Sequence, residues 1–239
     1  MGKFAMILSG GLGTRMGGDT PKQYVQVNGK MVVSSTMETI AQCDLKGLVL
    51  VAADEWRDIL MEEWIAIGAK QISFAFADPG ANRQCSIRNA LIELSRMGAL
   101  PEDVVLIQDA ARPNTKLELI QTIFAVFDED TQGAVEAVVP VIPMKDTVYF
   151  SADGAMLTER LDRSKVLAGQ APEAFRFGLY QKATEDLMPH RILEINGSAE
   201  PALIAGMRVQ TVMGDESNYK ITTKEDLERW KNECERIRP

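Results

Sequence analysis

The sequence FAMILSGGLGTRMGG occupies residues 4–18, close to the N-terminus. Its first five residues form an apolar run without polar alternation, which is typical of a strand buried on both faces of a parallel sheet. The glycines that follow would let backbone N–H groups approach phosphates closely, where a Cβ atom would clash. The segment therefore predicts a buried strand that leads directly into an anion-binding loop.

This loop alone does not define the class of nucleotide site. Gly11-Leu12-Gly13 could begin a dinucleotide-binding fingerprint, but the third glycine comes one position late. The loop also lacks the Gly-Lys-Ser/Thr ending of a P-loop. Taken in isolation, it could equally be an ordinary strand-to-loop turn.

The rest of the chain alternates between short apolar runs and amphipathic stretches. Further strands are expected at Gly47–Ala52, Gln71–Phe76, Val104–Ile107 and Ala134–Val141. Apolar residues three and four positions apart predict helices at Ser34–Ala41, Glu55–Ile67, Ser86–Met97 and Leu117–Phe127. This alternation predicts an α/β fold whose central sheet is mostly parallel and covered by helices on both faces.

Two hairpins interrupt this alternation. Asn28-Gly29 lies between short apolar segments and predicts a two-residue turn. Later, Asp146–Phe150 and Ala155–Leu161 flank Ser151-Ala152-Asp153-Gly154, which predicts a hairpin that projects from the sheet as a β-arm. The arm has too little chain for a core of its own, so we expect it to pack on something else, such as a second subunit.

The C-terminal third returns to the alternating pattern. We expect a helix at Phe177–Met188, a strand at Arg208–Met213 and a final helix that opens at Thr222, whose spacing to Glu225 fits a capping box. Neither repeats nor a low-complexity linker divide the chain. We therefore predict a single domain over residues 1–239, with a dimerisation arm at about residues 143–168.

Composition excludes several function classes. Hydrophobic residues make up 46% of the 239 residues and charged residues 25%, values that rule out a disordered or membrane class. The 26 lysines and arginines are outnumbered by 34 aspartates and glutamates, so a general nucleic-acid binder is not expected. Three widely spaced cysteines and a single histidine argue against a zinc site or a disulfide framework. We expect a soluble, cytoplasmic protein without membrane partners.

The glycine-rich loop has a specific continuation. Arg15 lies within it, and Pro21-Lys22-Gln23-Tyr24 follows. A Gly-Gly-x-Gly-Thr-Arg-Met loop followed by Pro-Lys resembles the sugar and polyol nucleotidyltransferases, and the Pro-Lys-Gln-Tyr variant resembles the polyol-phosphate cytidylyltransferases. Later segments match the same family in order, namely Gly80–Ser86, Gln108–Pro113, Asp146-Thr147, Arg163 and Ser217–Thr222. The resemblance extends along almost the whole chain and implies a Rossmann-like nucleotidyltransferase fold.

The resemblance implies that an acceptor phosphate oxygen attacks the α-phosphorus of CTP and that pyrophosphate leaves. Both reactants are polyanions, so catalysis would rest on positioning and on cationic stabilisation. We expect Arg15 and Lys22 to stabilise the α-phosphate and the pyrophosphate. Arg163, from the arm of a partner subunit, and Lys220 would bind the acceptor phosphate in a homodimer. Mg²⁺ is expected, held mainly by the phosphates of CTP and without a committed protein ligand.

Further site residues follow from the matched segments. The expected nucleotide-binding residues are Leu8, Ser9, Gly10, Gly11, Gly13, Thr14, Gly80, Ala81, Arg83 and Ser86. Asp109, Arg112 and Thr147 are expected to contact the acceptor. Two structural alternatives stay open: Arg112 could be a buried strut that pairs with Asp109, and Ser86 could simply cap the helix that begins there.

The sequence departs from the family pattern in two segments. Gln170-Ala171-Pro172-Glu173 stands where the family usually has Gln-Thr-Pro-Gln, and Asn196-Gly197 replaces a Thr-Asp pair. Losing a hydroxyl and a carboxylate changes the partners that a polyol would find, so the acceptor specificity is affected more than the nucleotide chemistry.

Several functions remain open at this stage. We expect a CDP-polyol product, with ribitol 5-phosphate ahead as acceptor and a role in making a cell-wall or capsule precursor. 2-C-methyl-D-erythritol 4-phosphate, in isoprenoid biosynthesis, is the main alternative. Two further alternatives are an enzyme that uses another phosphate acceptor and a nucleotide-binding module without turnover.

Overall fold

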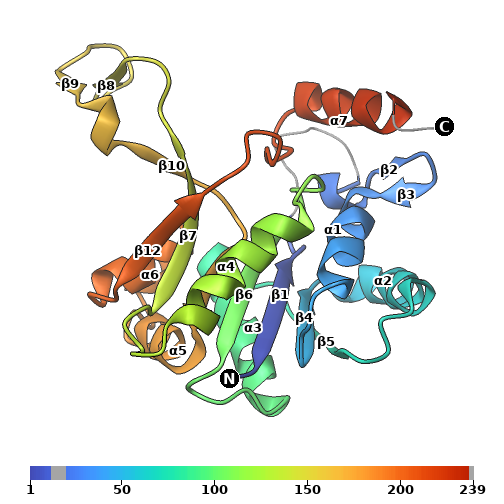
Figure 1. The fold of residues 1–239 in the computed structure, drawn as a ribbon. Helices are drawn as coiled ribbons and strands as arrows, with labels where there is room; N and C mark the ends of the chain where they lie inside the picture. Colours follow the sequence, from blue (N-terminus) through green and yellow to red (C-terminus); the bar gives the residue numbers. More distant parts are fainter. Residues whose placement is uncertain (12–19, 237–239) are drawn as a thin grey trace.

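The protein is described by a computed structural model that covers residues 1–11 and 20–236. Within these residues an eight-stranded sheet runs in the order β10-β7-β11-β6-β1-β4-β5, and β12 pairs with β7 at the outer edge (Figure 1). The strands of this sheet are β1 (Lys3–Leu8), β4 (Gly47–Val51), β5 (Ser73–Ala77), β6 (Val104–Asp109), β7 (Ala137–Pro143), β10 (Leu167–Gly169), β11 (Glu173–Arg176) and β12 (Val209–Met213). The predicted α/β fold with a mostly parallel sheet is confirmed.

Helices cover both faces of this sheet. The helices are α1 (Val32–Ala41), α2 (Asp54–Ile67), α3 (Arg83–Arg96), α4 (Leu117–Glu129), α5 (Phe177–Glu185), α6 (Ala199–Ile204) and α7 (Lys224–Arg236). Short 3₁₀ helices are η2 (Lys22–Tyr24), η3 (Arg163–Lys165) and η4 (Arg191–Leu193). Helices α1, α2 and α4 pack on one face, whereas α3, α5 and α6 pack on the other. Two apolar cores therefore hold the sheet between them.

The centre of the sheet is parallel and mostly apolar. Met6 of β1 lies opposite Ile107 of β6 on one side and Val49 of β4 on the other. Every residue of β4 and β6 is buried, as expected for strands covered on both faces. Because these strands run in the same direction, β1 and β6 end at the same edge of the sheet, at Leu8 and Asp109.

The antiparallel part of the sheet was not predicted. β11 pairs antiparallel with both β6 and β7, and β10 pairs antiparallel with the end of β7. Both strands are short, with three and four residues, so neither gives a hydrophobic period that the sequence could reveal. β11 nevertheless matters, because it places Glu173 beside the end of β6.

Among the helix starts that differ from the prediction, those of α3 and α7 have a clear physical cause. α3 begins at Arg83, not at Ser86, because the Asn82 side chain accepts a hydrogen bond from the N–H of Cys85 at 2.8 Å and caps the helix. The capping box of α7 lies one residue later than predicted. The Asp226 carboxylate accepts from the N–H of Thr223 at 2.9 Å, and the Thr223 hydroxyl accepts in return from the N–H of Asp226 at 3.2 Å.

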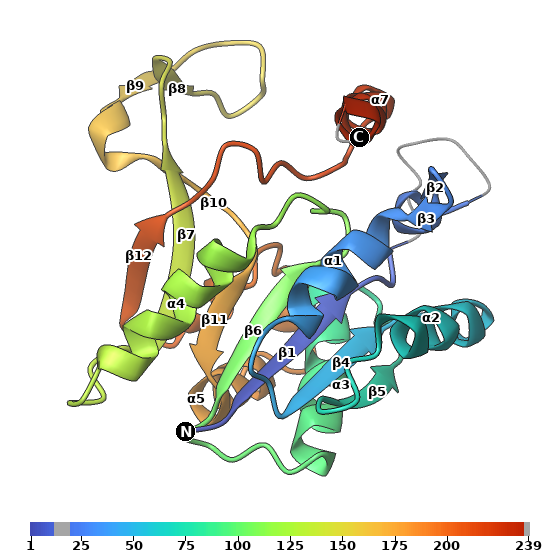
Figure 2. The ribbon, with the colours of Figure 1, turned by 45° about the vertical axis from the view of Figure 1, so that its right-hand side comes forward.

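Both predicted hairpins are present. β2 (Gln26–Val27) and β3 (Lys30–Met31) flank Asn28 and Gly29, whose φ angles of 55° and 80° are those of the expected turn. In the arm, β8 (Val148–Phe150) pairs with β9 (Glu159–Leu161), so these strands are shorter than predicted and the loop between them is longer. Figure 2 shows the arm, in yellow, extending away from the sheet beyond the end of β7.

The C-terminal helix has its own small core. Trp230 and Leu227 of α7 pack with Val27, Val32 and Ile221, apart from the two main cores. α7 thereby fastens the chain that precedes it, including Lys220, over the edge of the sheet where β6 ends. None of the helices in the described ranges is long and apolar enough to cross a membrane.

Trp230→Ala tests this fastening. Trp230 is 4% exposed, and truncating a buried tryptophan leaves a cavity, so we expect the free energy of unfolding to fall by about 3 kcal/mol. Asn232→Ala, at an exposed position of the same helix, is the control and should change stability by less than about 0.5 kcal/mol. Urea unfolding followed by circular dichroism measures both. Equal midpoints for the two variants would show that α7 is not held by this cluster.

Candidate active site

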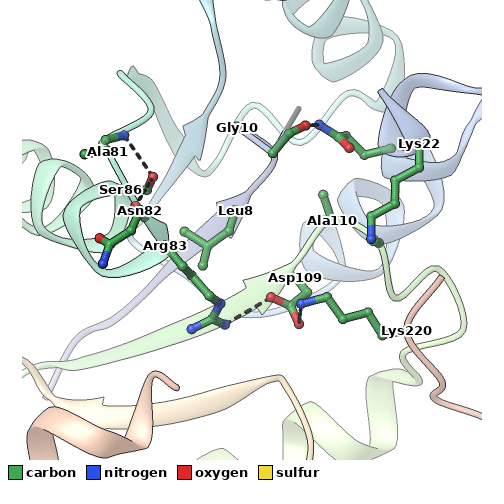
Figure 3. A pocket seen from close by; sticks show the side chains of 14 residues that line it. Leu8, Gly10, Lys22, Ala81, Asn82, Arg83, Ser86, Asp109, Ala110 and Lys220 are labelled. Atoms are coloured by element: carbon green, nitrogen blue, oxygen red, sulfur yellow. Dashed lines mark hydrogen bonds and ion pairs between the residues drawn. The ribbon is translucent and has the colours of Figure 1, made fainter. Parts of the chain in front are cut away.

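A cavity of about 470 Å³ opens at the edge of the sheet where β1 and β6 end (Figure 3). Open α/β sheets bind ligands at the carboxyl ends of their strands. The lining comes from the end of β1 and the glycines after it, η2, the loop before α3, the end of β6 and the loop before α7. Its residues are Leu8, Gly10, Gly11, Lys22, Gln23, Gly80, Ala81, Asn82, Arg83, Ser86, Asp109, Ala110, Ala111 and Lys220.

The structure brings most of the predicted site residues to this cavity. Those lining it are Leu8, Gly10, Gly11, Lys22, Gly80, Ala81, Arg83, Ser86, Asp109 and Lys220. Ser9, Arg112, Thr147 and Arg163 do not line it. Gly13, Thr14 and Arg15 lie outside the described residues.

The cavity is also lined by four residues that were not predicted as site residues, namely Gln23, Asn82, Ala110 and Ala111. Gln23 and Asn82 were polar residues within matched segments, which is a usable signal. Ala110 and Ala111 contribute chiefly backbone and small side chains, whose position at a cavity wall depends on the fold.

η2 fixes the start of the glycine-rich loop. Gln23 Nε2 donates hydrogen bonds to the carbonyls of Ser9 at 2.6 Å and Gly11 at 2.7 Å, and the Tyr24 hydroxyl donates to the Ser9 carbonyl at 2.9 Å. The Ser9 side chain is 1% exposed and donates to the Tyr24 hydroxyl at 3.0 Å. The Ser9 side chain therefore supports the loop from below and does not line the cavity. Lys22 is brought to the cavity by the same short helix.

The loop before α3 is held by side chains of the helix that it precedes. The N–H of Gly80 donates to Ser86 Oγ at 2.9 Å, and Ser86 Oγ donates to the Asn82 carbonyl at 3.0 Å. A Cβ atom on Gly80 would overlap the first turn of α3 at Cys85 and Ser86, so only glycine fits. Ser86 is thus not the helix cap, which is Asn82; it ties the loop to the first turn of α3.

Asp109 is the electrostatic centre of the cavity. Its carboxylate lies 3.0 Å from Arg83 Nη2, 3.1 Å from Lys220 Nζ and 3.3 Å from Arg112 Nε. Burial favours the neutral acid, but the three cations outweigh it and hold the pKa of Asp109 well below its usual range. Figure 3 shows Arg83 and Lys220 reaching Asp109 from opposite sides. Asp109 is therefore ionised and fixes both cations at the cavity wall.

Arg112 has the geometry of a strut. Its side chain is 12% exposed, contacts Asp109 through Nε, and donates from Nη1 to the Asn218 carbonyl at 2.6 Å. Arg112 does not line the cavity. Within one chain, its contacts are those of a buried strut that pairs with Asp109. Asn218 extends the same support: its Nδ2 donates to the Ala171 carbonyl at 2.8 Å, and its Oδ1 accepts from Thr115 Oγ1 at 2.9 Å. These bonds hold the loop that carries Lys220.

The arm residues lie apart from this cavity within one chain. Arg163 follows β9, is exposed and donates to the Lys145 carbonyl, and Thr147 is exposed at the start of the arm. The arm also exposes large apolar side chains, including Tyr149, Phe150, Met156 and Leu157. The expected roles of Arg163 and Thr147 thus depend on contacts that a single chain does not make.

The described lining offers little to a metal ion directly. Asp109 is the carboxylate among the lining residues that the structure describes, and both of its oxygens already contact cations. Over residues 1–11 and 20–236, no three His, Cys, Asp or Glu side chains gather closely enough to hold a metal. This donor set fits a metal that is held through the phosphates of a bound nucleotide.

Known proteins were compared with the chain. The family model described as 2-C-methyl-D-erythritol 4-phosphate cytidylyltransferase (IspD) matches residues 4–232. The enzyme of that name from Pseudomonas fluorescens Pf0-1 is 32% identical over 237 residues, which cover 96% of each chain. Its counterpart from Pseudomonas aeruginosa is also 32% identical, over 95% of this chain and 93% of the relative.

Solved structures agree with the fold. A 4-diphosphocytidyl-2C-methyl-D-erythritol synthase from Anaerococcus prevotii has a TM-score of 0.78 at 22% identity and covers 98% of both chains. The Francisella tularensis 2-C-methyl-D-erythritol 4-phosphate cytidylyltransferase reaches the same TM-score and identity over 97% of this chain. The family match over residues 4–232 and the sequence identity to the curated relatives show that this chain is a CTP-dependent cytidylyltransferase and belongs to the 2-C-methyl-D-erythritol 4-phosphate cytidylyltransferase family.

Proposed function

We propose that the protein transfers CMP from CTP to 2-C-methyl-D-erythritol 4-phosphate and releases pyrophosphate. The observation that carries the proposal is the cluster of cations, Lys22, Arg83 and Lys220, on the wall of one cavity between two glycine-containing loops. Such a wall suits two polyanionic reactants that must meet, in a chain with a net charge of −8. The reaction needs no protein nucleophile, because the acceptor phosphate itself attacks.

The choice of acceptor changes with the comparisons. The matched family and the curated relatives carry the name of the methylerythritol phosphate enzyme, which was the alternative in the sequence analysis. We therefore place this acceptor ahead of ribitol 5-phosphate. The proposal places the protein in isoprenoid precursor synthesis instead of cell-wall or capsule assembly.

The residues divide the work along the cavity. We propose that backbone N–H groups of the glycine-rich loop, with Arg15 and Lys22, hold the triphosphate, while the Gly80 loop and Ser86 hold the nucleoside. An oxygen of the acceptor phosphate forms a bond to the α-phosphorus, and the bond from that phosphorus to the bridging oxygen of pyrophosphate breaks. Lys22 would offset the charge that develops on the leaving group. Mg²⁺, bound through the CTP phosphates, would neutralise part of the same charge.

Lys220 is the proposed cation for the acceptor phosphate. Its ammonium is held by Asp109 at 3.1 Å, and the next residue, Ile221, is buried and donates from its N–H to the Ala111 carbonyl at 2.8 Å. The ammonium is therefore positioned before any ligand arrives, which lowers the cost of ordering it in the complex.

We propose in addition that the arm completes the site of a partner subunit in a homodimer. The exposed apolar side chains of the arm, Tyr149, Phe150, Met156 and Leu157, are a surface that a second copy could bury. Arg163 would then supply a guanidinium to the partner's acceptor phosphate. The proposal explains why a matched arginine lies away from the cavity of its own chain.

The acceptor assignment is tested by pyrophosphate release. With CTP and Mg²⁺, we expect rapid release with 2-C-methyl-D-erythritol 4-phosphate and at least about a hundredfold slower release with ribitol 5-phosphate, since a site built for one polyol leaves polar groups unpaired with another. Glycerol 3-phosphate and a sample without acceptor are the controls. Faster release with ribitol 5-phosphate would restore the original order of the two acceptors.

Lys22→Ala and Lys220→Ala distinguish the two ends of the cavity. Loss of Lys22 should lower kcat by roughly a hundredfold or more, because its contact strengthens as charge develops. Loss of Lys220 should raise the KM for the acceptor while leaving the KM for CTP within about twofold. Steady-state kinetics with each substrate varied gives both values, and Lys224→Ala, at an exposed position of α7, is the control. Identical kinetic defects in the two lysine variants would contradict this division.

Mixing two impaired variants, assayed at an acceptor concentration well below the KM of either, tests the composite site. If Arg163 serves the partner subunit, Arg163→Ala and Lys220→Ala chains should complement each other, because their heterodimer has one intact site. After subunits exchange, random pairing should restore about a quarter of wild-type activity. If Arg163 acts within its own chain, the mixture gains no activity over the separate variants and the proposal fails. A monomeric mass by light scattering would also contradict it.

A further inference from the structure

Glu173 is a buried carboxylate that the proposed reaction does not use. It begins β11, where it lies opposite Ile107 of β6, and it is 9% exposed. Since side chains alternate along a strand, Glu173, Ile107 and Asp109 share one face of the sheet. Its Oε2 atom is buried and has no hydrogen-bond partner among the described residues. Burying a carboxylate costs free energy unless its surroundings supply hydrogen bonds or an opposite charge.

A chain of contacts links Glu173 to Asp109. The Ser198 hydroxyl, 1% exposed just before α6, accepts from Arg83 Nη1 and lies close enough to the Glu173 carboxylate to lower its pKa. Arg83 Nη2 donates to Asp109 Oδ1 at 3.0 Å. The guanidinium of Arg83 is therefore held at both ends, by Ser198 on one side and by Asp109 on the other.

The groups that act on the Glu173 carboxylate come from α3, from β6 and the loop after it, and from the residue before α6. Burial raises the pKa of Glu173; the Ser198 hydroxyl and the Arg83 charge lower it, Asp109 raises it, and Arg112 lowers it, with a net rise. Tyr180 of α5 donates from its hydroxyl to the Ser198 carbonyl at 2.7 Å and is buried. Arg83 therefore contacts Asp109 directly and also feels the charge of Glu173.

The same contacts join the two segments in which the sequence departs from the family pattern. Glu173 belongs to the first segment, with Ala171, and Ser198 directly follows Asn196-Gly197 in the second. The interaction between the Ser198 hydroxyl and the Glu173 carboxylate physically connects these departures. They meet at Arg83, which lines the cavity next to Asp109.

We propose that Glu173 is a positioning residue: through Ser198 it fixes one end of Arg83, so that the other end holds Asp109 in the orientation that presents Lys220 to the acceptor. This proposal rests on the proposed function for the identity of the acceptor. Glu173 itself does not touch the reacting atoms. Its action reaches the substrate only along the path from Ser198 to Arg83 and Asp109.

Kinetics of Glu173→Gln, Ser198→Ala and the double variant test this path. Glu173→Gln preserves shape and one acceptor oxygen, so the fold should survive. We expect each single variant to lower kcat/KM for 2-C-methyl-D-erythritol 4-phosphate by roughly tenfold to a hundredfold, with the KM for CTP within about twofold. Because both residues act through one path, kcat/KM of the double variant should be no lower than that of the less active single variant. Glu185→Gln, which alters another carboxylate paired with an α3 arginine, is the control.

The pH dependence of kcat/KM for the acceptor is a second test, because a merely structural role of Glu173 would not change it. The ionised form of Glu173 holds Ser198 and Arg83, and its pKa is raised. In the wild type, kcat/KM for the acceptor should therefore fall as the pH drops through this raised pKa. In Glu173→Gln the fall should be absent, because the amide does not titrate. Unchanged kcat/KM and an unchanged profile, or losses that add in the double variant, would overturn the proposal.

The mobility of the Arg83 side chain, measured without substrate, tests this proposal independently of which reaction the protein catalyses. Rotation of the Arg83 guanidinium about its Nε–Cζ bond, followed by ¹⁵N-detected NMR, should be slow in the wild type and in Glu185→Gln. It should be at least about tenfold faster in Glu173→Gln and Ser198→Ala, where one end of Arg83 is released. If no acceptor supports turnover, the proposed function fails, while the NMR comparison still decides whether Glu173 positions Arg83. Equal rotation rates in all four proteins would reject it.

Discussion

The ion pairs around Asp109 are the constraint on which the site depends. The carboxylate sits at the end of a fully buried strand and gathers Arg83 from the start of α3, Arg112 from the loop after β6 and Lys220 from the loop before α7. A buried carboxylate without these cations would be expensive, and the cations without it would repel one another. Three segments that are distant in sequence are therefore held together by one side chain.

This arrangement explains how an acidic chain can bind anions. The protein carries a formal charge of −8, yet Lys22, Arg83 and Lys220 line one cavity with a single carboxylate among the described lining residues. Asp109 does not cancel this local charge; it orients two of the cations and leaves the wall net positive. A site of this kind attracts polyanions by local geometry, independently of the overall field.

The sequence predicted the parts of the fold that repeat a strong local pattern. Apolar runs indicated the buried strands at Phe4–Leu8 and Val104–Ile107, and the Asn28-Gly29 pair indicated a turn. β10 and β11 were missed because strands of three and four residues carry no measurable period, and their partners are set by tertiary structure. Helix starts shifted where Asn82 and Thr223 proved to be better caps than the residues chosen.

The site shows the same division between local and tertiary information. The motifs pointed to Lys22, Arg83, Asp109 and Lys220, and all four line one cavity. Lys22 and Arg83 each begin a helix, Asp109 ends a strand and Lys220 lies in the loop before α7, so local sequence patterns could mark them. The motif comparison marked Glu173 only as part of a departure from the family pattern, since its position beside the end of β6 comes from an antiparallel pairing. Its contact with Ser198 links the two segments that depart from the family pattern. Differences that look independent along the chain can therefore act as one change beside Arg83 and Asp109.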